Sequence, residues 1–196
     1  MTAYSNFSDV SIRYFSRPGA INTDAVFEAA AKRAAERSIG RIVVATCSGR
    51  TALAARKAFP SGMKIAAVTH ATGFSGADIQ ELQEENKSEL LARGVDVLTC
   101  AHAFGSVGRG VRNKVGAYQV DEIMAYTLRM FGQGTKVAIE IALMAADAGL
   151  IRTDEDVISI GGTKDGADTA LVIRPATSAH CLDLKIREII CKPADL

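Results

Sequence analysis

A run of six residues combines hydroxyl, thiol and guanidinium side chains in a pattern that suits anion binding. It reads Thr46-Cys47-Ser48-Gly49-Arg50-Thr51 and lies between an apolar stretch and a helix-forming stretch. Backbone N–H groups at the start of a helix lack intrahelical partners and carry partial positive charge, so they favour an anion. The hydroxyls and the guanidinium add further donors. We predict a phosphate-binding loop; the alternative is that Ser48 and Thr51 only cap the helix.

The stretch 102–118 is rich in glycine and basic residues and contains no acidic residue. We interpret it as a long loop that closes over an anionic ligand, because long loops in compact domains are usually functional. Its ligand contacts would come from Gly105, Gly108 and Arg109. The alternatives are a solvated basic loop and a contact between subunits. The stretch matches neither the ATP-binding P-loop nor the dinucleotide-binding glycine pattern.

Three further side chains are candidates for chemistry. His70 follows an apolar stretch and acts either as a general acid or base or as a hydrogen-bond partner of a loop carbonyl. Cys47 precedes a helix start, which would depress its thiol pKa if the thiol were exposed. Glu140 lies in an apolar run, so it must form an ion pair or contact a ligand. The cysteines and histidines show no zinc-site spacing, and we predict no metal.

The elements that must position these residues follow from the apolar pattern, which alternates between helical spacing and short continuous runs. Strand–helix–strand repeats of this kind predict right-handed crossovers and a parallel sheet. The last two long apolar runs surround a polar, glycine-rich loop at 161–168 and predict a hairpin. We expect a first helix between the caps at 22–24 and Gly40, and further helices over 51–59, 78–92, 120–131 and 135–148. The expected strands are 41–46, 64–69, 95–99, 157–160, 169–174 and 184–190.

We therefore expect one domain spanning residues 1–196 with a three-layer α/β/α fold. Its sheet would be mostly parallel with an antiparallel C-terminal strand. Ligands bind such folds beyond the carboxyl ends of the strands, where the Ser48 loop and His70 lie. The helix at 136–148 is apolar on nearly every side and must be covered by the sheet or by another subunit. Together with the apolar C-terminal run, it favours a homo-oligomer.

Composition excludes several classes of protein. Lys plus Arg is 23 and Asp plus Glu is 22, so the formal charge is +1, which argues against nucleic acid and anionic membranes as partners. Apolar residues make up 48%, which excludes global disorder. No apolar run approaches the roughly 18 residues of a membrane span, and the start resembles no signal peptide. Four dispersed cysteines then predict reduced thiols in the cytoplasm.

The strings Ile42-Val43-Val44-Ala45-Thr46-Cys47-Ser48-Gly49-Arg50-Thr51-Ala52 and Ile65-Ala66-Ala67-Val68-Thr69 resemble the C-terminal α/β domain of pyruvate kinase. The likeness covers about 25–174 and is strongest to small stand-alone proteins of mostly unassigned activity. In that family the T-x-S-G-[RK]-[ST] loop holds a phosphate of an allosteric sugar bisphosphate in many members. The resemblance implies the phosphate ligands Thr46, Ser48, Gly49, Arg50 and Thr51. It also implies a second segment closing over the ligand, with Gly162, Thr163, Lys164, Gly166 and Ala167; we add the preceding Gly161 as a candidate ligand-binding residue.

The 196 residues do not accommodate the barrel domain that carries catalysis in pyruvate kinase, so that activity is not expected. We predict instead a protein that binds a phosphorylated small molecule, either a nucleotide such as flavin mononucleotide (FMN) or a sugar phosphate. Asp165 and Asp168 would then contact ribityl or ribose hydroxyls or form the turn. The sequence identifies no reaction. The alternative is a non-catalytic regulatory or assembly module that self-associates.

Overall fold

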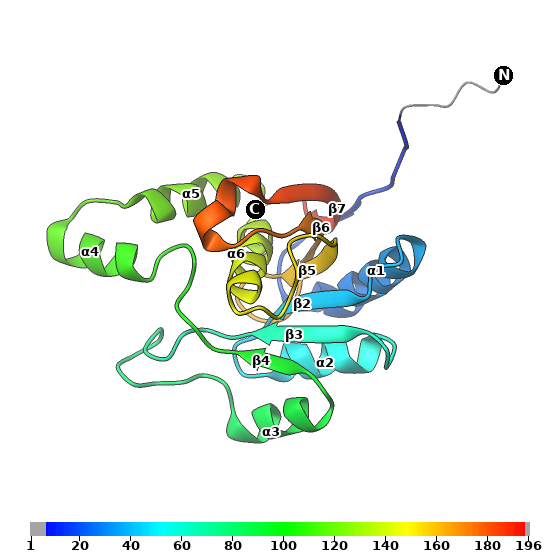
Figure 1. The fold of residues 1–196 in the computed structure, drawn as a ribbon, viewed down its shortest axis with the longest axis horizontal. Helices are drawn as coiled ribbons and strands as arrows, with labels where there is room; N and C mark the ends of the chain where they lie inside the picture. The colour runs from blue at the N-terminus through cyan, green and yellow to red at the C-terminus, as the bar shows by residue number, and fades with distance from the viewer. Residues whose placement is uncertain (1–6, 195–196) are drawn as a thin grey trace.

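A seven-stranded sheet organises the chain (Figure 1). The computed structural model describes residues 7–194, so the start Met1–Asn6, where no signal peptide is predicted, lies outside them. The strand order is β1-β7-β6-β5-β2-β3-β4. The strands are β1 (Arg13–Phe15), β2 (Arg41–Ala45), β3 (Lys64–Val68), β4 (Asp96–Leu98), β5 (Val157–Gly161), β6 (Thr169–Arg174) and β7 (Lys185–Pro193).

The sheet is mostly parallel, as predicted. Strands β2, β3, β4 and β5 pair in parallel, and β1 pairs in parallel with β7. Strand β6 is antiparallel to both of its neighbours and forms the predicted hairpin with β5. The carboxyl ends of β2, β3, β4 and β5 therefore meet at one edge of the sheet, which is the edge expected to bind ligands.

Helices cover both faces of the sheet, which gives the predicted three layers (Figure 1). Central strand β2 is buried on both sides, because Ile42 and Val44 pack into one core cluster and Val43 into the other. No helix among residues 7–194 is both long and apolar enough to cross a membrane. One face carries α1 (Thr23–Glu36), α2 (Arg50–Ala58) and α3 (Glu84–Ala92). The other face carries α4 (Val107–Val115), α5 (Val120–Arg129) and α6 (Gln133–Asp147). Short 3₁₀ turns span Ala20–Asn22 and Ser178–Asp183.

Helix α6 is the all-round apolar helix of the sequence, and the chain itself covers it. It packs against β2, β3, β5 and β6 on one side and α5 on another. The approach to β5 is so close that a Cβ on Gly161 would lie 2.3 Å from the Gly134 carbonyl oxygen. The sequence left two possible packing partners for this helix, the sheet or another subunit, and the structure shows the sheet. This helix therefore gives no reason to expect an oligomer.

Two predictions of local structure were wrong. The stretch 102–118 is not a long loop, because α4 occupies its middle. Val107, Val111 and Val115 lie one turn apart, and Gly116 ends the helix with a positive φ of 83°. The helix predicted from residue 78 begins only at Glu84, and an extended loop precedes it. Strand β1 was not predicted, since its three residues are too few to show a period.

Candidate functional site

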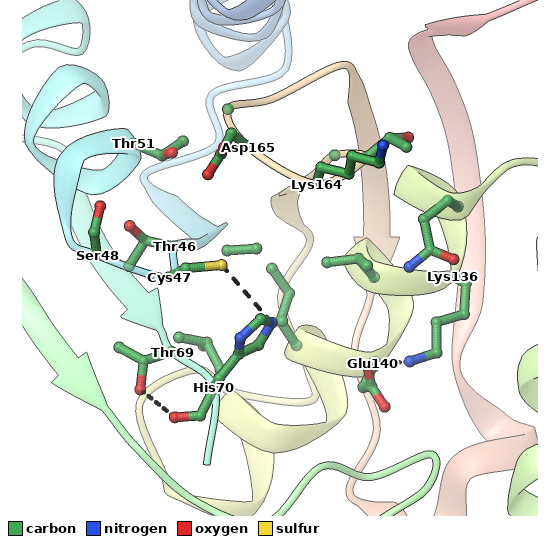
Figure 2. A pocket seen from close by; sticks show the side chains of 18 of the residues that line it. Thr46, Cys47, Ser48, Thr51, Thr69, His70, Lys136, Glu140, Lys164 and Asp165 are labelled. Atoms are coloured by element: carbon green, nitrogen blue, oxygen red, sulfur yellow. Dashed lines mark hydrogen bonds and ion pairs between the residues drawn. The ribbon is translucent and has the colours of Figure 1, made fainter. Parts of the chain in front are cut away.

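A cavity of about 830 Å³ lies at the carboxyl edge of the sheet. We call residues 46–51, at the start of α2, the α2 wall, and the lining residues 133–144 of α6 the α6 wall. Figure 2 shows Cys47 of the α2 wall, with its thiol directed toward His70. Residues 162–166, which follow β5, line the cavity as well. Four segments far apart in the sequence thus meet at one site.

The turn of the α2 wall has a shape that neighbouring groups hold in place. The Gly49 amide donates to Thr46 Oγ1 at 3.1 Å, and Asn86 of α3 donates from Nδ2 to the Ser48 carbonyl at 2.8 Å. Gly49 has a φ of 96°, and a Cβ there would lie 2.7 Å from the Cβ of Asn86. Glycine is required at this position by both conformation and space.

The helix start in the α2 wall has no side-chain cap. Ser48 Oγ instead accepts a hydrogen bond from Arg50 Nε at 3.2 Å. Within residues 7–194, the backbone amides of Cys47, Ser48, Arg50 and Thr51 make no hydrogen bond to the protein. The alternative that Ser48 and Thr51 merely cap the helix is therefore wrong. Several polar N–H groups are left available to a bound group at the edge of the cavity.

His70 connects Cys47 to a carboxylate. Its Nδ1 lies 2.7 Å from Glu81 Oε2, and its Nε2 lies 3.8 Å from Cys47 Sγ. Of the roles considered for His70, the side chain is paired with a carboxylate and not with a loop carbonyl. Burial raises the thiol pKa of Cys47 to about 11, with the charges of Glu81 and Asp165 adding to the effect. A depressed pKa was expected only for an exposed thiol; Cys47 is half-buried, and desolvation outweighs the helix start.

Rings gather at the far side of His70. The ring centroids of His70 and Phe74 are 4.1 Å apart, and those of Phe74 and His102 are 5.0 Å apart. The Arg109 guanidinium lies 5.2 Å from the centroid of the Phe74 ring. His102 Nε2 accepts a hydrogen bond from the Ala71 amide at 3.3 Å, and burial lowers the imidazole pKa of His102. These rings pack close to one another and line one part of the cavity.

The α6 wall carries a buried ion pair. Lys136 Nζ contacts Glu140 Oε2, and the Phe104 amide donates to Glu140 Oε1 at 2.9 Å. Burial lowers the ammonium pKa of Lys136, while the adjacent carboxylate opposes that shift. Of the two roles considered for Glu140, the ion pair is the one that the structure shows. Both side chains also line the cavity.

Asp168 holds the segment after β5 in place. Its Oδ2 accepts hydrogen bonds from the Gly19 amide at 2.9 Å and the Thr163 amide at 3.1 Å. Its Oδ1 accepts from Thr169 Oγ1 at 2.8 Å, and the residue is fully buried. Asp168 therefore forms the turn, whereas Asp165 lines the cavity.

The structure brings most of the predicted site residues together. Those that line the cavity are Thr46, Cys47, Ser48, Arg50, Thr51, His70, Arg109, Gly162, Thr163, Lys164 and Gly166. Gly49 shapes the turn behind them. The remaining predicted residues, Gly105, Gly108, Gly161 and Ala167, do not line it. Gly108 instead packs against α5, where an added Cβ would lie 2.2 Å from Asp121 Oδ1.

Sequence reasoning did not select four residues that shape the site. Phe74, His102 and Lys136 line the cavity, and Glu81 holds His70. A signal existed for His102, because it follows strand β4 at the same edge of the sheet as His70. No comparable pattern pointed to Glu81, which lies in an irregular loop.

The fold and site define an α/β protein with an uncapped helix start beside a cavity at the carboxyl edge of its sheet. Residues 24–173 match the family described as pyruvate kinase, alpha/beta domain. This match covers most of the chain, and the protein belongs to that family, as the resemblance in the sequence implied.

Two solved structures similar to this chain are pyruvate kinases from Cryptosporidium parvum. The first is 18% identical, with a TM-score of 0.43, and the match covers 82% of this chain and 24% of that one. The second, a complex with ADP, is 19% identical, with a TM-score of 0.39, and the match covers 80% of this chain and 23% of that one. The chain thus matches about a quarter of the length of these enzymes.

Proposed function

We propose that the protein binds a phosphorylated small molecule, with the phosphate at the α2 wall. The observation that carries this proposal is a set of backbone amides, at Cys47, Ser48, Arg50 and Thr51, that have no hydrogen-bond partner among residues 7–194. They border the cavity at an uncapped helix start. Phosphate oxygens accept several hydrogen bonds at once and gain from the partial positive charge of a helix N-terminus. The hydroxyl groups and the Arg50 guanidinium add donors at the same place.

Charged groups across the cavity support the same orientation of the ligand. Lys164 lines the cavity and adds a positive charge there, whereas the Arg109 guanidinium lies over the Phe74 ring. Lys136 is already paired with Glu140 and has less to offer. The Asp165 carboxylate would repel a phosphate and is better suited to accept a hydrogen bond from a ligand hydroxyl. A phosphate at the α2 wall with a hydroxyl-bearing chain beyond it satisfies these groups.

The ring cluster favours a nucleotide over a sugar phosphate. Phe74, His70 and His102 line the cavity with ring side chains, and Arg109 lies beside Phe74. A planar heterocycle stacks on such rings, whereas a sugar gains little from them. A nucleotide such as FMN, with its phosphate at one end and its ring system at the other, is the ligand we propose.

A pair of ligands that differ by one phosphate tests the proposal. Isothermal titration calorimetry should show FMN binding far more tightly than riboflavin, because riboflavin leaves the α2-wall amides without a partner. A sugar phosphate titrated in parallel measures what the ring contributes. Equal affinity for FMN and riboflavin, or no binding of any phosphorylated compound, would overturn the proposal.

A second candidate function, self-association, is favoured by the exposed apolar side chains of α4 and α5. Val107 is 81% exposed, and Val120 and Met130 are each 75% exposed. Exposed apolar side chains on neighbouring helices often mark a contact surface, and a second copy of the chain is the commonest occupant. Light scattering after size-exclusion chromatography should give a dimer or larger species. The variant Met130→Glu should shift it toward the monomer, and a monomeric parent protein would remove this candidate.

A further inference from the structure

Three side chains stand in the order thiol, imidazole, carboxylate beside the cavity. Cys47 Sγ is 3.8 Å from His70 Nε2, and His70 Nδ1 is 2.7 Å from Glu81 Oε2. With Nδ1–H donated to the carboxylate, Nε2 is left as an acceptor that faces the thiol. A nucleophile, a base and a group that orients the base are the parts that covalent catalysis requires, whatever their order in the sequence.

We propose that Cys47 is a nucleophile for acyl transfer, with His70 as its general base and Glu81 as a positioning residue. The substrate class is an ester or thioester small enough to enter the cavity. This inference goes beyond phosphate binding, because it concerns the thiol and its base and requires no phosphate on the acyl compound, although both use the turn that begins α2.

The loop that carries Glu81 is held firmly enough to fix the imidazole. The Gly73 amide donates to the Ile79 carbonyl at 2.9 Å, and the Gln83 amide donates to the Ser48 carbonyl at 3.3 Å. Gln80 Nε2 reaches Thr72 Oγ1 at 3.1 Å. Glu81 and His70 are each 31% exposed, so the pair is partly shielded from water. Because these hydrogen bonds fix the loop, Glu81 holds the His70 imidazole in one orientation toward the Cys47 thiol.

The raised pKa of Cys47 fits a mechanism in which the thiol is neutral at rest. The groups that act on this thiol are its own burial and the negative charges of Glu81 and Asp165, while His102 and Arg109 line the same cavity. A thiol that does not ionise by itself needs a base that takes its proton during attack. His70 Nε2 is placed for that role.

The bonds made and broken balance with water as the co-reactant. Cys47 Sγ forms a bond to the acyl carbon as His70 Nε2 takes the thiol proton. The bond from the acyl carbon to the leaving oxygen or sulfur then breaks, and His70 returns the proton to the leaving group. Water, activated by His70, then hydrolyses the thioester formed on Cys47, which releases a carboxylic acid and restores the Cys47 thiol. No oxidant or reductant is needed.

The amide of Ser48, the residue after the nucleophile, is placed to stabilise the oxyanion that forms during attack. It has no hydrogen-bond partner among residues 7–194 and lies at the uncapped start of α2. The amide that follows the nucleophile supplies one oxyanion donor in hydrolases built on a strand-to-helix turn. Here the same turn connects β2 to α2.

Acetylation by p-nitrophenyl acetate tests the inference on the full chain. The parent protein should release a burst of nitrophenolate and gain one acetyl group on Cys47, seen by peptide mass spectrometry. Cys47→Ala should lose the burst, and His70→Gln should slow acylation at least about a hundred-fold. Cys181→Ala is the matched control, since this half-buried cysteine has no hydrogen bond to an imidazole within the described chain. It should acylate like the parent.

The pH profile separates positioning by Glu81 from a purely structural role. Glu81→Gln should slow acylation and move the pH at which its rate rises, and Glu81→Asp should restore most of the rate. A Cys47 acetylation rate that is unchanged in His70→Gln, or no acetyl on Cys47 at all, would overturn the inference. Circular dichroism of the same variants shows whether they are folded. FMN binding by the parent protein is measured separately, so a failure of this inference stays distinct from a failure of phosphate binding.

Discussion

The two walls of the cavity satisfy their polar groups in different ways. At the α2 wall, the amides of Cys47, Ser48, Arg50 and Thr51 have no partner in the described part of the protein. At the α6 wall, Lys136 and Glu140 are buried and neutralise each other. An anion can bind the first wall by replacing water. Binding at the second would separate a buried ion pair, which costs several kcal/mol. Charge inside a cavity is therefore a poor guide to where an anion binds.

The largest effect should come from breaking the α6 wall. In Glu140→Ala, Lys136 stays buried without its carboxylate and the Phe104 amide loses its acceptor, so the free energy of unfolding should fall by about 3–5 kcal/mol. Urea denaturation followed by circular dichroism measures this loss. The double variant Lys136→Met, Glu140→Leu should recover most of it, because no charge is left unpaired. A loss below about 1 kcal/mol would mean that the pair is not closed to water.

A smaller loss should follow from adding one methyl group behind the α2 wall. Gly49→Ala combines a positive φ with a clash against Asn86, so the free energy of unfolding should fall by about 1–3 kcal/mol. FMN binding should weaken as well, because the turn must move. Gly62→Ala is the matched control, since a Cβ there meets nothing within 4 Å. Equal stability of the two variants would show that the turn is not constrained by α3.

Removing the guanidinium of the α2 wall should affect binding and leave stability unchanged. Arg50→Ala removes one charged donor but no backbone amide, so FMN binding should weaken by roughly 1–3 kcal/mol, measured by calorimetry. Lys57→Ala removes an exposed charge from the other end of the same helix and should bind like the parent. If both variants bound equally weakly, the effect would come from overall charge and not from contact at this wall.

The smallest effect should be a dependence of stability on pH at the ring cluster. Burial lowers the pKa of His102 below its ordinary value of 6.5, so the folded protein prefers neutral imidazole. The stability from His102 is complete above that value and is lost as pH falls toward the folded-state pKa. Thermal denaturation between about pH 7.5 and 5.5 should show this loss. His102→Gln should flatten it, whereas His180→Asn, at an exposed site, should not.

The sequence predicted the α2 wall well because everything needed lies within one local turn. A buried strand, a glycine and a helix start follow each other along the chain, and their order alone puts free amides at the sheet edge. Glu81 could not be predicted in the same way, because an irregular loop brings it back to His70. Helix α4 was missed because its glycines and basic residues obscured the spacing of Val107, Val111 and Val115.

The pKa of Cys47 shows a different limit. The position before a helix was visible in the sequence, and it predicts a lowered pKa only for an exposed thiol. The degree of burial is a tertiary property that depends on which loops close over the thiol. In this protein burial dominates, and the shift has the opposite sign.

Asp168 ties the matched domain to residues that precede it in the chain. Its buried carboxylate takes a hydrogen bond from Gly19, which lies upstream of the residues that match the family. A shortened protein beginning at residue 24 would contain the whole matched region, yet it would leave that carboxylate short of a donor. It would also remove Thr23, whose hydroxyl accepts from the Ala167 amide. The cavity-lining segment 162–166 therefore depends on residues that lie before the part of the chain matched by the family.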